Sequence, residues 1–279
     1  MKRVDRVYRT IMGALTRLVF GQAPQLERVG LPGMPRPFFP WYLLSGGTVR
    51  IFFTIFAKWE RIGLENLPSE GGYILAANHV ASADPPMLAV AVYPRWPRFM
   101  AKLELFQKRP LIGWIFALSG AFPVRRLDAD LAALREAQAQ LANGCILGMF
   151  PEGHRSDNAA LGEAYHGTAL IALRSGVPIV PVGITGSENF RRGLGVFFRR
   201  PHVRIHFGEP FVLEAGDRVR RDDVEAGTER LMREIAALIP ARYRGVYRER
   251  FADLPDEALA DRRPEGLTAG SSGRPEGEA

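Results

Sequence analysis

Residues 73–84 read YILAANHVASAD, and this stretch decides the fold. Its apolar first part, Tyr73–Ala77, is too short for a helix and predicts a buried β-strand. Asn78 and His79 follow at the end of that strand, and Asp84 comes five positions after His79. The carboxyl end of a strand is where α/β folds usually place their chemistry. The stretch therefore predicts both a central strand and a candidate site.

Outward from this stretch, short apolar runs alternate with amphipathic segments between residues 72 and 210. This alternation predicts an α/β domain with a mixed, partly parallel sheet that is flanked by helices. The predicted strands are Tyr73–Ala77, Arg98–Ala101, Ala121–Val124, Cys145–Phe150, Ile179–Ile184 and Val203–Phe207, and the predicted helices are Pro86–Val92, Leu111–Leu118, Ala129–Ala142, Gly167–Arg174 and Val224–Ile239.

The composition limits what kind of protein this is. The chain has 279 residues, and 47% of them are hydrophobic, which is enough for a substantial core and excludes global disorder. Its single cysteine, Cys145, excludes a disulfide scaffold and a zinc site built on two thiolates. The net charge of +7 indicates an anionic partner, for which phospholipid headgroups, nucleic acid and phosphorylated metabolites all qualify.

Residues 1–57 precede the predicted sheet and are suited to a membrane surface. Over the first twenty residues, apolar side chains recur at helical spacing between lysines and arginines, which is typical of a helix lying among anionic headgroups. An ordinary surface helix packed on the domain is the alternative. Pro37–Ala57 is apolar but contains Arg50, and a central arginine costs about 2.5–3.5 kcal/mol on insertion into a bilayer. We interpret it as a bent or interfacial segment rather than a span, and predict an N-terminal two-helix membrane-associating element.

The chain thus divides into three predicted parts. Residues 1–57 form the membrane-associating element, residues 58–240 form the catalytic domain, and residues 241–279 form a basic segment and tail. Gly, Ser, Pro, Glu and Arg dominate residues 262–279, where apolar residues are almost absent, so this end is predicted to be disordered.

His79 and Asp84 are the first candidate pair for catalysis. A histidine that acts as a base needs a carboxylate to fix its tautomer and to stabilise the imidazolium that forms. The four residues between them make a loop short enough to return the aspartate to the imidazole. A loop histidine beside an aspartate that caps a helix gives the same spacing, so the pair alone is a weak signal.

Two further blocks bring charged residues to the same predicted edge of the sheet. Phe150–Ser156 follows an apolar strand, and its Glu152 and Arg155 are suited to bind hydroxyl and phosphate groups of a substrate. Gly153 between them permits close approach of the backbone. A surface turn with an internal Glu–Arg pair is the plain alternative. Gly120–Arg126 is likewise a predicted strand that runs into arginine.

With these blocks in this order, the chain resembles the glycerolipid acyltransferases, typified by the enzymes that acylate 1-acylglycerol-3-phosphate. The resemblance covers about residues 58–210 and does not reach residues 1–57 or 240–279. The segments that carry it are Asn78–Asp84, similar to the family's NHxxxxD box, Lys102–Phe106, Gly120–Arg126, similar to its second block, Phe150–Ser156, similar to its FPEGTRS block, and Val177–Val182, similar to its VPIVPV-type block.

The resemblance implies transfer of a fatty acyl group from a thioester to the free hydroxyl of lysophosphatidic acid, giving phosphatidic acid in phospholipid biosynthesis. The thioester would be acyl-CoA or acyl carrier protein, used as a co-substrate, with no cofactor and no metal. Glycerol-3-phosphate, another lysophospholipid or a lyso-aminolipid stay open as acceptors. His79 would be the general base, and Asp84 would orient it.

The same resemblance suggests how the acceptor is bound. Arginine matches the oxygens of a phosphate group bidentately, so Arg126 and Arg155 are the predicted phosphate ligands, with Lys102 a weaker candidate. Glu152 is predicted to position an acceptor hydroxyl or to hold an arginine. The chain departs from the family's pattern at His154, where threonine is usual, and at Arg125, where an acidic residue is common. The second departure makes the site more basic.

Two other classes of function compete with this one. A hydrolase with a His–Asp pair needs a nucleophile elbow of the G-x-S-x-G type, which this chain lacks. A nucleic-acid-binding protein is suggested by the positive charge, yet the basic residues are dispersed and no recognised binding segment is present. Because the implied acceptor is an amphiphile and the donors are cytosolic, we expect a peripheral enzyme on the cytoplasmic side of the cell membrane, bound to its anionic surface.

Overall fold

The structure is a computed structural model, and it describes residues 39–92, 97–103, 121–124, 131–192, 200–216 and 218–256. The predicted helix Leu111–Leu118, the first twenty residues and the predicted disordered tail lie outside these ranges.

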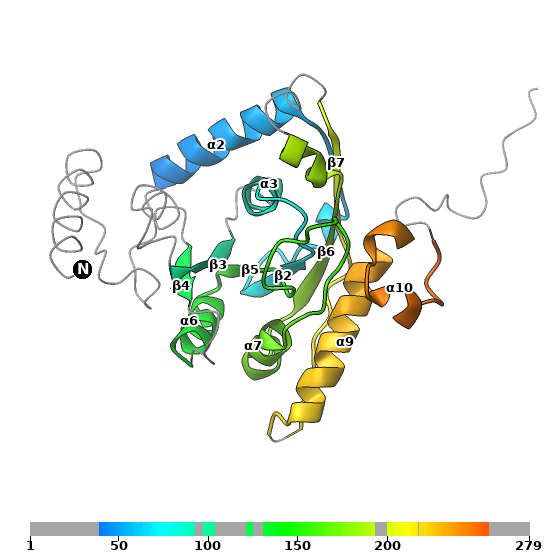
Figure 1. The fold of residues 1–279 in the computed structure, drawn as a ribbon. Helices are drawn as coiled ribbons and strands as arrows, with labels where there is room; N and C mark the ends of the chain where they lie inside the picture. The colour runs from blue at the N-terminus through cyan, green and yellow to red at the C-terminus, as the bar shows by residue number, and fades with distance from the viewer. Residues whose placement is uncertain are drawn as a thin grey trace, which may run out of the picture.

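The described strands form one seven-stranded sheet in the order β1-β7-β6-β2-β5-β3-β4 (Figure 1). Its neighbouring strands run parallel except for β6 and β7, which are antiparallel. The sheet is therefore mixed, and the predicted α/β class is confirmed. The strands are β1 (Lys58–Ile62), β2 (Tyr73–Ala77), β3 (Arg98–Lys102), β4 (Phe122–Val124), β5 (Ile146–Met149), β6 (Ile179–Thr185) and β7 (His202–Phe207).

Strand β2 lies near the middle of the sheet, between β5 and β6, and its residues alternate between two hydrophobic clusters. Tyr73, Leu75 and Ala77 belong to one cluster, and Ile74 and Ala76 belong to the other. Because successive side chains of a strand point to opposite faces, this strand must be apolar throughout. That requirement explains the unbroken apolar run from which the strand was predicted.

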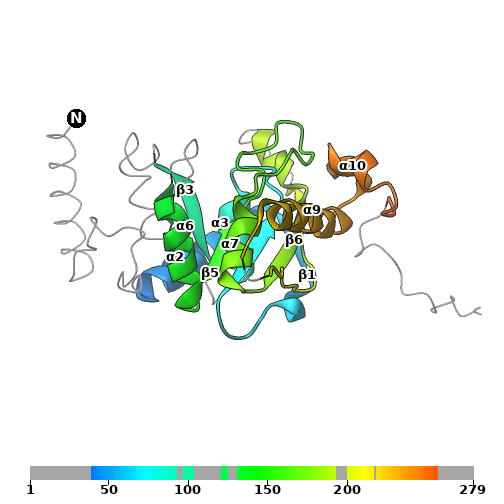
Figure 2. The same ribbon diagram turned by 90° about the horizontal axis from the view of Figure 1, so that it is seen from below.

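Helices cover both faces of the sheet. Figure 1 shows α2 and α3 on one side and α6, α7 and α9 on the other, and Figure 2 shows the second group from below, in front of the strands. The helices are α2 (Phe39–Phe56), α3 (Asp84–Ala91), α6 (Leu131–Ala142), α7 (Gly167–Ser175), α9 (Arg221–Ala237) and α10 (Tyr247–Arg250), with 3-10 turns at Leu64–Asn66, Ser187–Arg192 and Ala241–Tyr243.

Strand β1 was not predicted from the sequence. It lies at the edge of the sheet and pairs with β7, from Lys58 opposite His202 to Ile62 opposite His206. Its sequence, KWERI, carries three charged residues in five, as suits an edge strand whose open side faces water. An apolar run was the signal used for the other strands, and this strand does not have one.

Helix α2 contains the apolar segment that was predicted to lie at a membrane interface. Phe53 is buried on the domain, and its ring meets that of Phe190 edge-on at 5.8 Å between centroids. Ile51, Phe52 and Ile55 of the same helix are exposed. The helix therefore packs on the domain by one side and presents apolar side chains on another. Of the helices that the structure describes, none is both long enough and apolar enough to span a bilayer.

The core of the domain continues past residue 240, where the sequence led us to place its end. Tyr243, Tyr247 and Phe251 are buried and belong to the same cluster as Ile235 and Ile239 at the end of α9. These three aromatic residues are spaced four apart within an arginine-rich stretch. Because the arginines indicate a solvent-exposed segment, the sequence did not reveal that the aromatic side chains are part of the core. Residues 241–256 are thus part of the packed domain.

Candidate active site

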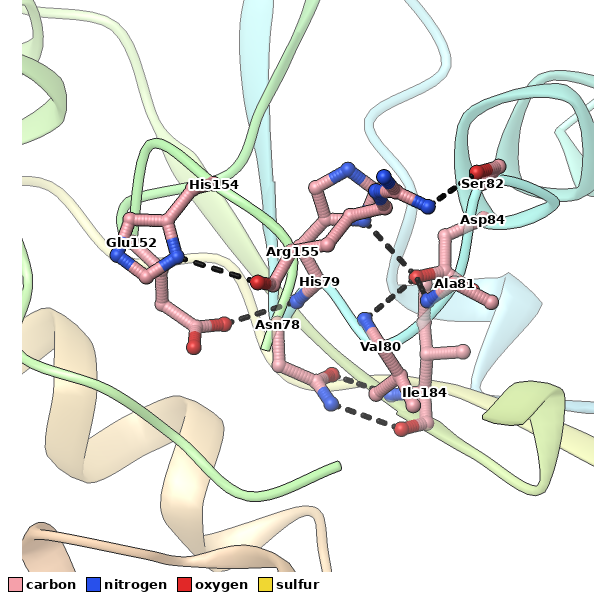
Figure 3. A network of polar contacts seen from close by, with 10 residues as sticks. All are labelled: Asn78, His79, Val80, Ala81, Ser82, Asp84, Glu152, His154, Arg155 and Ile184. Atoms are coloured by element: carbon pink, nitrogen blue, oxygen red, sulfur yellow. Dashed lines mark hydrogen bonds and ion pairs between the residues drawn. The ribbon is translucent and has the colours of Figure 1, made fainter. Parts of the chain in front are cut away.

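His79 and Asp84 meet at the end of β2, as their spacing predicts. The imidazole Nδ1 of His79 lies 3.0 Å from Oδ2 of Asp84, and the same oxygen accepts the backbone N–H groups of Val80 and Ala81 at 2.6 Å each (Figure 3). Asp84 is fully buried, while the His79 side chain is 13% exposed. A carboxylate can only accept, so it selects the neutral tautomer with the proton on Nδ1. Nε2 is left with a lone pair that can take a proton.

The local sequence explains why the loop closes in this way. Asp84 opens α3, and the two prolines that follow occupy first-turn positions, where no backbone N–H is needed. A carboxylate in the first turn is also favoured by the helix dipole. Oδ1 of Asp84 is buried without a hydrogen-bond partner among the described residues, so the contacts of this side chain converge on Oδ2.

Asn78 fixes the backbone just before the histidine. Its side-chain amide donates to the carbonyl oxygen of Ile184 at 2.8 Å and accepts the N–H of Ile184 at 2.6 Å. Both atoms of the buried amide are thus used to extend the pairing of β2 with β6 by one residue. This role of Asn78 was not predicted. The position of Asn78 next to His79 indicates that it lies at the site, but the residue that it bonds is 106 positions away and could not be identified from the sequence.

Glu152 supports the same histidine from the other side. Its Oε1 accepts the backbone N–H of His79 and its Oε2 accepts that of Gly162, both at 2.8 Å. The residue is 1% exposed. Burial raises the pKa of the Glu152 carboxyl above its ordinary value, while the two N–H groups act in the opposite direction. Both oxygens of Glu152 thus accept backbone N–H groups, one of them that of His79, so Glu152 positions His79. Its predicted contact with an acceptor hydroxyl or an arginine stays a prediction.

Aromatic stacking holds the imidazole ring. The ring of Phe150 stacks on that of His79 with centroids 4.2 Å apart and planes at 24°, and Phe99 stacks on Phe150 at 6.0 Å. Gly148 of β5 leaves the space that Phe99 needs, because a Cβ there would lie 2.2 Å from the Phe99 ring. The sequence placed Phe150 at a strand end but gave no sign of this contact.

Arg155 lies at the rim of this site, as expected. Its side chain is exposed, and Nη1 donates to the hydroxyl of Ser82 at 2.7 Å, within the loop between His79 and Asp84. Gly153 has a φ of 67°, and a Cβ there would lie 2.9 Å from the Tyr165 ring, so the tight turn after β5 requires glycine. This turn carries Arg155 toward the histidine.

The other predicted ligands are not placed. Arg126 lies outside the described residues, as does the side chain of Lys102, whose backbone ends β3. Their roles stay predictions. Among the residues that are described, no cluster of three histidine, cysteine, aspartate or glutamate side chains has a geometry suited to a metal ion.

Comparison with known proteins agrees with this geometry. The model of the acyltransferase family matches residues 58–185, which contain His79, Asp84, Glu152 and Arg155. The chain is 32% identical over 197 residues to the 1-acyl-sn-glycerol-3-phosphate acyltransferase of Streptococcus pneumoniae, covering 70% of this chain and 71% of that protein. The chain belongs to the acyltransferase family. It is an enzyme of the transferase class, as predicted.

A second relative supports the assignment, and a solved structure shares the fold. The 1-acyl-sn-glycerol-3-phosphate acyltransferase of Bacillus subtilis is 31% identical over 169 residues, covering 61% of this chain and 81% of that protein. The crystal structure of the 1-acyl-sn-glycerophosphate acyltransferase PlsC from Thermotoga maritima superposes with a TM-score of 0.54 at 22% identity, covering 85% of this chain and 99% of that one. This acyltransferase therefore shares the fold of that protein.

We expect Asp84→Asn to lower kcat of acyl transfer about 10²-fold while the fold is kept. The amide oxygen can accept the N–H groups that converge on Oδ2, and the amide nitrogen can take the place of Oδ1, so the tautomer of His79 survives and only the charge is lost. Steady-state kinetics and thermal unfolding check this. Asp223→Asn is the control, because Asp223 accepts the backbone N–H of Arg220 at the exposed start of α9. Equal kcat in both variants would show that the Asp84 charge has no catalytic effect.

Proposed function

We propose that this acyltransferase transfers a fatty acyl group from a thioester to the free hydroxyl of lysophosphatidic acid, forming phosphatidic acid in phospholipid biosynthesis. The observation that carries the proposal is the His79–Asp84 pair, whose Nε2 has no hydrogen-bond partner among the described residues, beside Arg155, which forms no ion pair with a described carboxylate. The similarity to relatives that are named 1-acyl-sn-glycerol-3-phosphate acyltransferase supports the choice of acceptor.

The reaction needs a base because an alcohol is a poor nucleophile at neutral pH. Nε2 of His79 takes the proton of the acceptor hydroxyl as the oxygen attacks the thioester carbonyl. The imidazolium that forms is stabilised by the Asp84 carboxylate, whose Oδ2 lies 3.0 Å from Nδ1 of His79. The tetrahedral intermediate then expels the thiolate, which the imidazolium can protonate. The C–S bond breaks, the ester C–O bond forms, and the proton passes from alcohol to thiol.

The choice of acceptor follows from charge. The phosphate group of lysophosphatidic acid carries close to two negative charges, and an arginine binds it through two parallel N–H groups. Arg155 is exposed at the rim and hydrogen-bonds to a neutral serine hydroxyl, so a phosphate group can compete for its guanidinium.

Acyl-CoA and acyl carrier protein are both suitable donors. The proposed scheme uses neither a cofactor nor a metal.

A membrane surface supplies the acceptor. Ile51, Phe52 and Ile55 of α2 are exposed apolar residues on a helix that packs on the domain through Phe53. Burial of such side chains among lipid tails, together with attraction of arginines to anionic headgroups, is the usual basis of peripheral attachment. Because the thioester donors are cytosolic, we assign the enzyme to the cytoplasmic face of the cell membrane.

We expect His79→Ala to lower kcat by about 10²–10⁴-fold, because it removes the base. Purified enzyme should be incubated with a labelled acyl donor and a panel of lysolipids, and the products resolved by mass. Wild type should make phosphatidic acid from lysophosphatidic acid faster than it acylates the other acceptors. A variant that keeps more than about a tenth of wild-type turnover would remove His79 from the mechanism. A preference for another acceptor would redirect the proposal to that lipid.

Arg155→Lys should raise KM for lysophosphatidic acid with a much smaller change in KM for the acyl donor, because a point charge does not reproduce the bidentate contact. Steady-state kinetics with each substrate varied in turn checks this. Arg248→Lys, on the exposed surface of α10, is the control. If the donor KM rises instead, Arg155 binds the phosphates of the donor.

Ile55→Glu should weaken sedimentation of the enzyme with phosphatidylglycerol vesicles, since a carboxylate resists burial among lipids. Leu131→Glu is the matched control: Leu131 is 59% exposed and Ile55 is 55% exposed, but Leu131 lies on α6, on the opposite side of the sheet. A point variant is preferable to removing the helix, because Phe53 and Ala57 are buried in the domain. Equal loss of binding in both variants would contradict a role for α2.

A further inference from the structure

The loop of residues 161–164 is held by a segment that lies outside the part of the chain matched by the family model. The N–H of Leu161 donates to the carbonyl oxygen of Tyr243 at 2.8 Å, and the carbonyl oxygen of Leu161 accepts the N–H of Val246 at 3.2 Å. The N–H of Ala164 donates to the hydroxyl of Tyr247 at 3.2 Å. We call residues 243–247 the C-terminal brace.

The brace acts on a peptide group that also contacts Glu152. The carbonyl of Leu161 and the N–H of Gly162 belong to the same planar peptide unit. Its oxygen accepts from Val246, and its N–H donates to Oε2 of Glu152 at 2.8 Å. The other oxygen of Glu152 accepts the N–H of His79. Two hydrogen bonds and one rigid plane therefore separate the brace from the carboxylate that holds the histidine.

A buried arginine keeps the brace in place. Arg244 is 2% exposed, and its guanidinium donates to the carbonyl oxygens of Ala236 and Ile239 at the end of α9. It also donates to the carbonyl oxygen of Pro255. Because the same residue is tied to α9 and to the chain that follows, the brace cannot shift without breaking several charge-assisted hydrogen bonds.

We propose that the C-terminal brace positions the catalytic histidine by fixing the Leu161–Gly162 peptide, whose N–H holds Glu152 against the backbone N–H of His79. The inference rests on the proposed role of His79 as the base of acyl transfer. It makes residues 243–247 positioning residues for the reaction, although none of them reaches the reacting atoms. Displacement of a catalytic group by about 1 Å can cost about 10²-fold in rate.

Gly245 offers a direct test. A Cβ at this position would lie 2.1 Å from the carbonyl oxygen of Leu161, so Gly245→Ala must push that peptide away. Gly176→Ala is the matched control, because Gly176 has a similar φ, 63° against 50°, and no atom within 4 Å of an added Cβ. Both variants bear the strain of alanine at positive φ, but only the first moves the Leu161–Gly162 peptide.

Gly245→Ala should lower kcat by about ten- to a hundredfold, while KM for the acyl donor changes by less than about twofold. Gly176→Ala should keep wild-type kcat. A purely structural role of the brace would instead lower the melting temperature of Gly245→Ala and leave its kcat per folded molecule unchanged, which would overturn the proposal. The rates are measured with whichever lysolipid the wild type acylates fastest, so a different acceptor would refute the proposed function and leave this test intact.

A double-mutant cycle shows whether the effect passes through Glu152. Glu152→Gln should lower kcat by itself, because an amide offers one acceptor oxygen where the carboxylate offers two. Adding Gly245→Ala to Glu152→Gln should then change kcat by less than about twofold, since both changes break the same connection. Multiplicative effects of the two substitutions would overturn the proposal.

Hydrogen exchange of the wild-type protein tests the same connection without an activity assay, and it does not depend on whether a variant folds. The amides of Leu161, Gly162 and Val246 should exchange with one common opening free energy, as members of one cooperative unit. If the Gly162 amide exchanged much faster than that of Val246, the peptide would not be held by the brace, and the proposal would fail even with an active enzyme.

Discussion

The contact between the imidazole of His79 and the carboxylate of Asp84 joins the end of β2 to the first turn of α3, and the other parts of the site are arranged around it. Because Oδ2 of Asp84 also accepts the N–H groups of Val80 and Ala81, the loop cannot turn the imidazole away without breaking three hydrogen bonds. Asn78 and Glu152 then fix the backbone that carries the imidazole, from β6 and from the turn after β5. The histidine is thus held by both its ring and its backbone.

Burial of two carboxylates that both contact His79 has an electrostatic cost, and the way this cost is offset affects function. A buried ion without partners loses several kcal/mol of solvation. Here the backbone supplies the compensation, since each hydrogen bond to a charged group contributes roughly 1.5–3 kcal/mol. Asp84 accepts two backbone N–H groups in addition to the imidazole, and Glu152 accepts two. Arg155 contacts a serine hydroxyl in place of either carboxylate, so its charge remains available to an anionic acceptor.

What could be predicted from the sequence was local. The apolar run of β2 marks a buried strand, and the five-residue interval between His79 and Asp84 fits a short loop, so both were identified. Features that depend on distant partners were missed. Glu152 was predicted to contact an acceptor hydroxyl or an arginine, and no local signal indicated that its carboxylate accepts an N–H ten residues further on. Strand β1 is stabilised by pairing with β7, which follows it by more than a hundred residues.

The site therefore has a fixed interior and an open rim, and the two tolerate change differently. His79, Asp84 and Glu152 are joined to one another or to neighbouring backbone N–H groups by hydrogen bonds of 2.6–3.0 Å, so substitution of any of them disturbs the others. His154 stands where glycerolipid acyltransferases usually have threonine, but its side chain is exposed, and its Nδ1 lies 3.2 Å from the carbonyl oxygen of Arg155. The exposed rim thus accommodates a side chain larger than threonine. Variation at the rim can thus alter which headgroup is bound, while the interior keeps the same proton transfer.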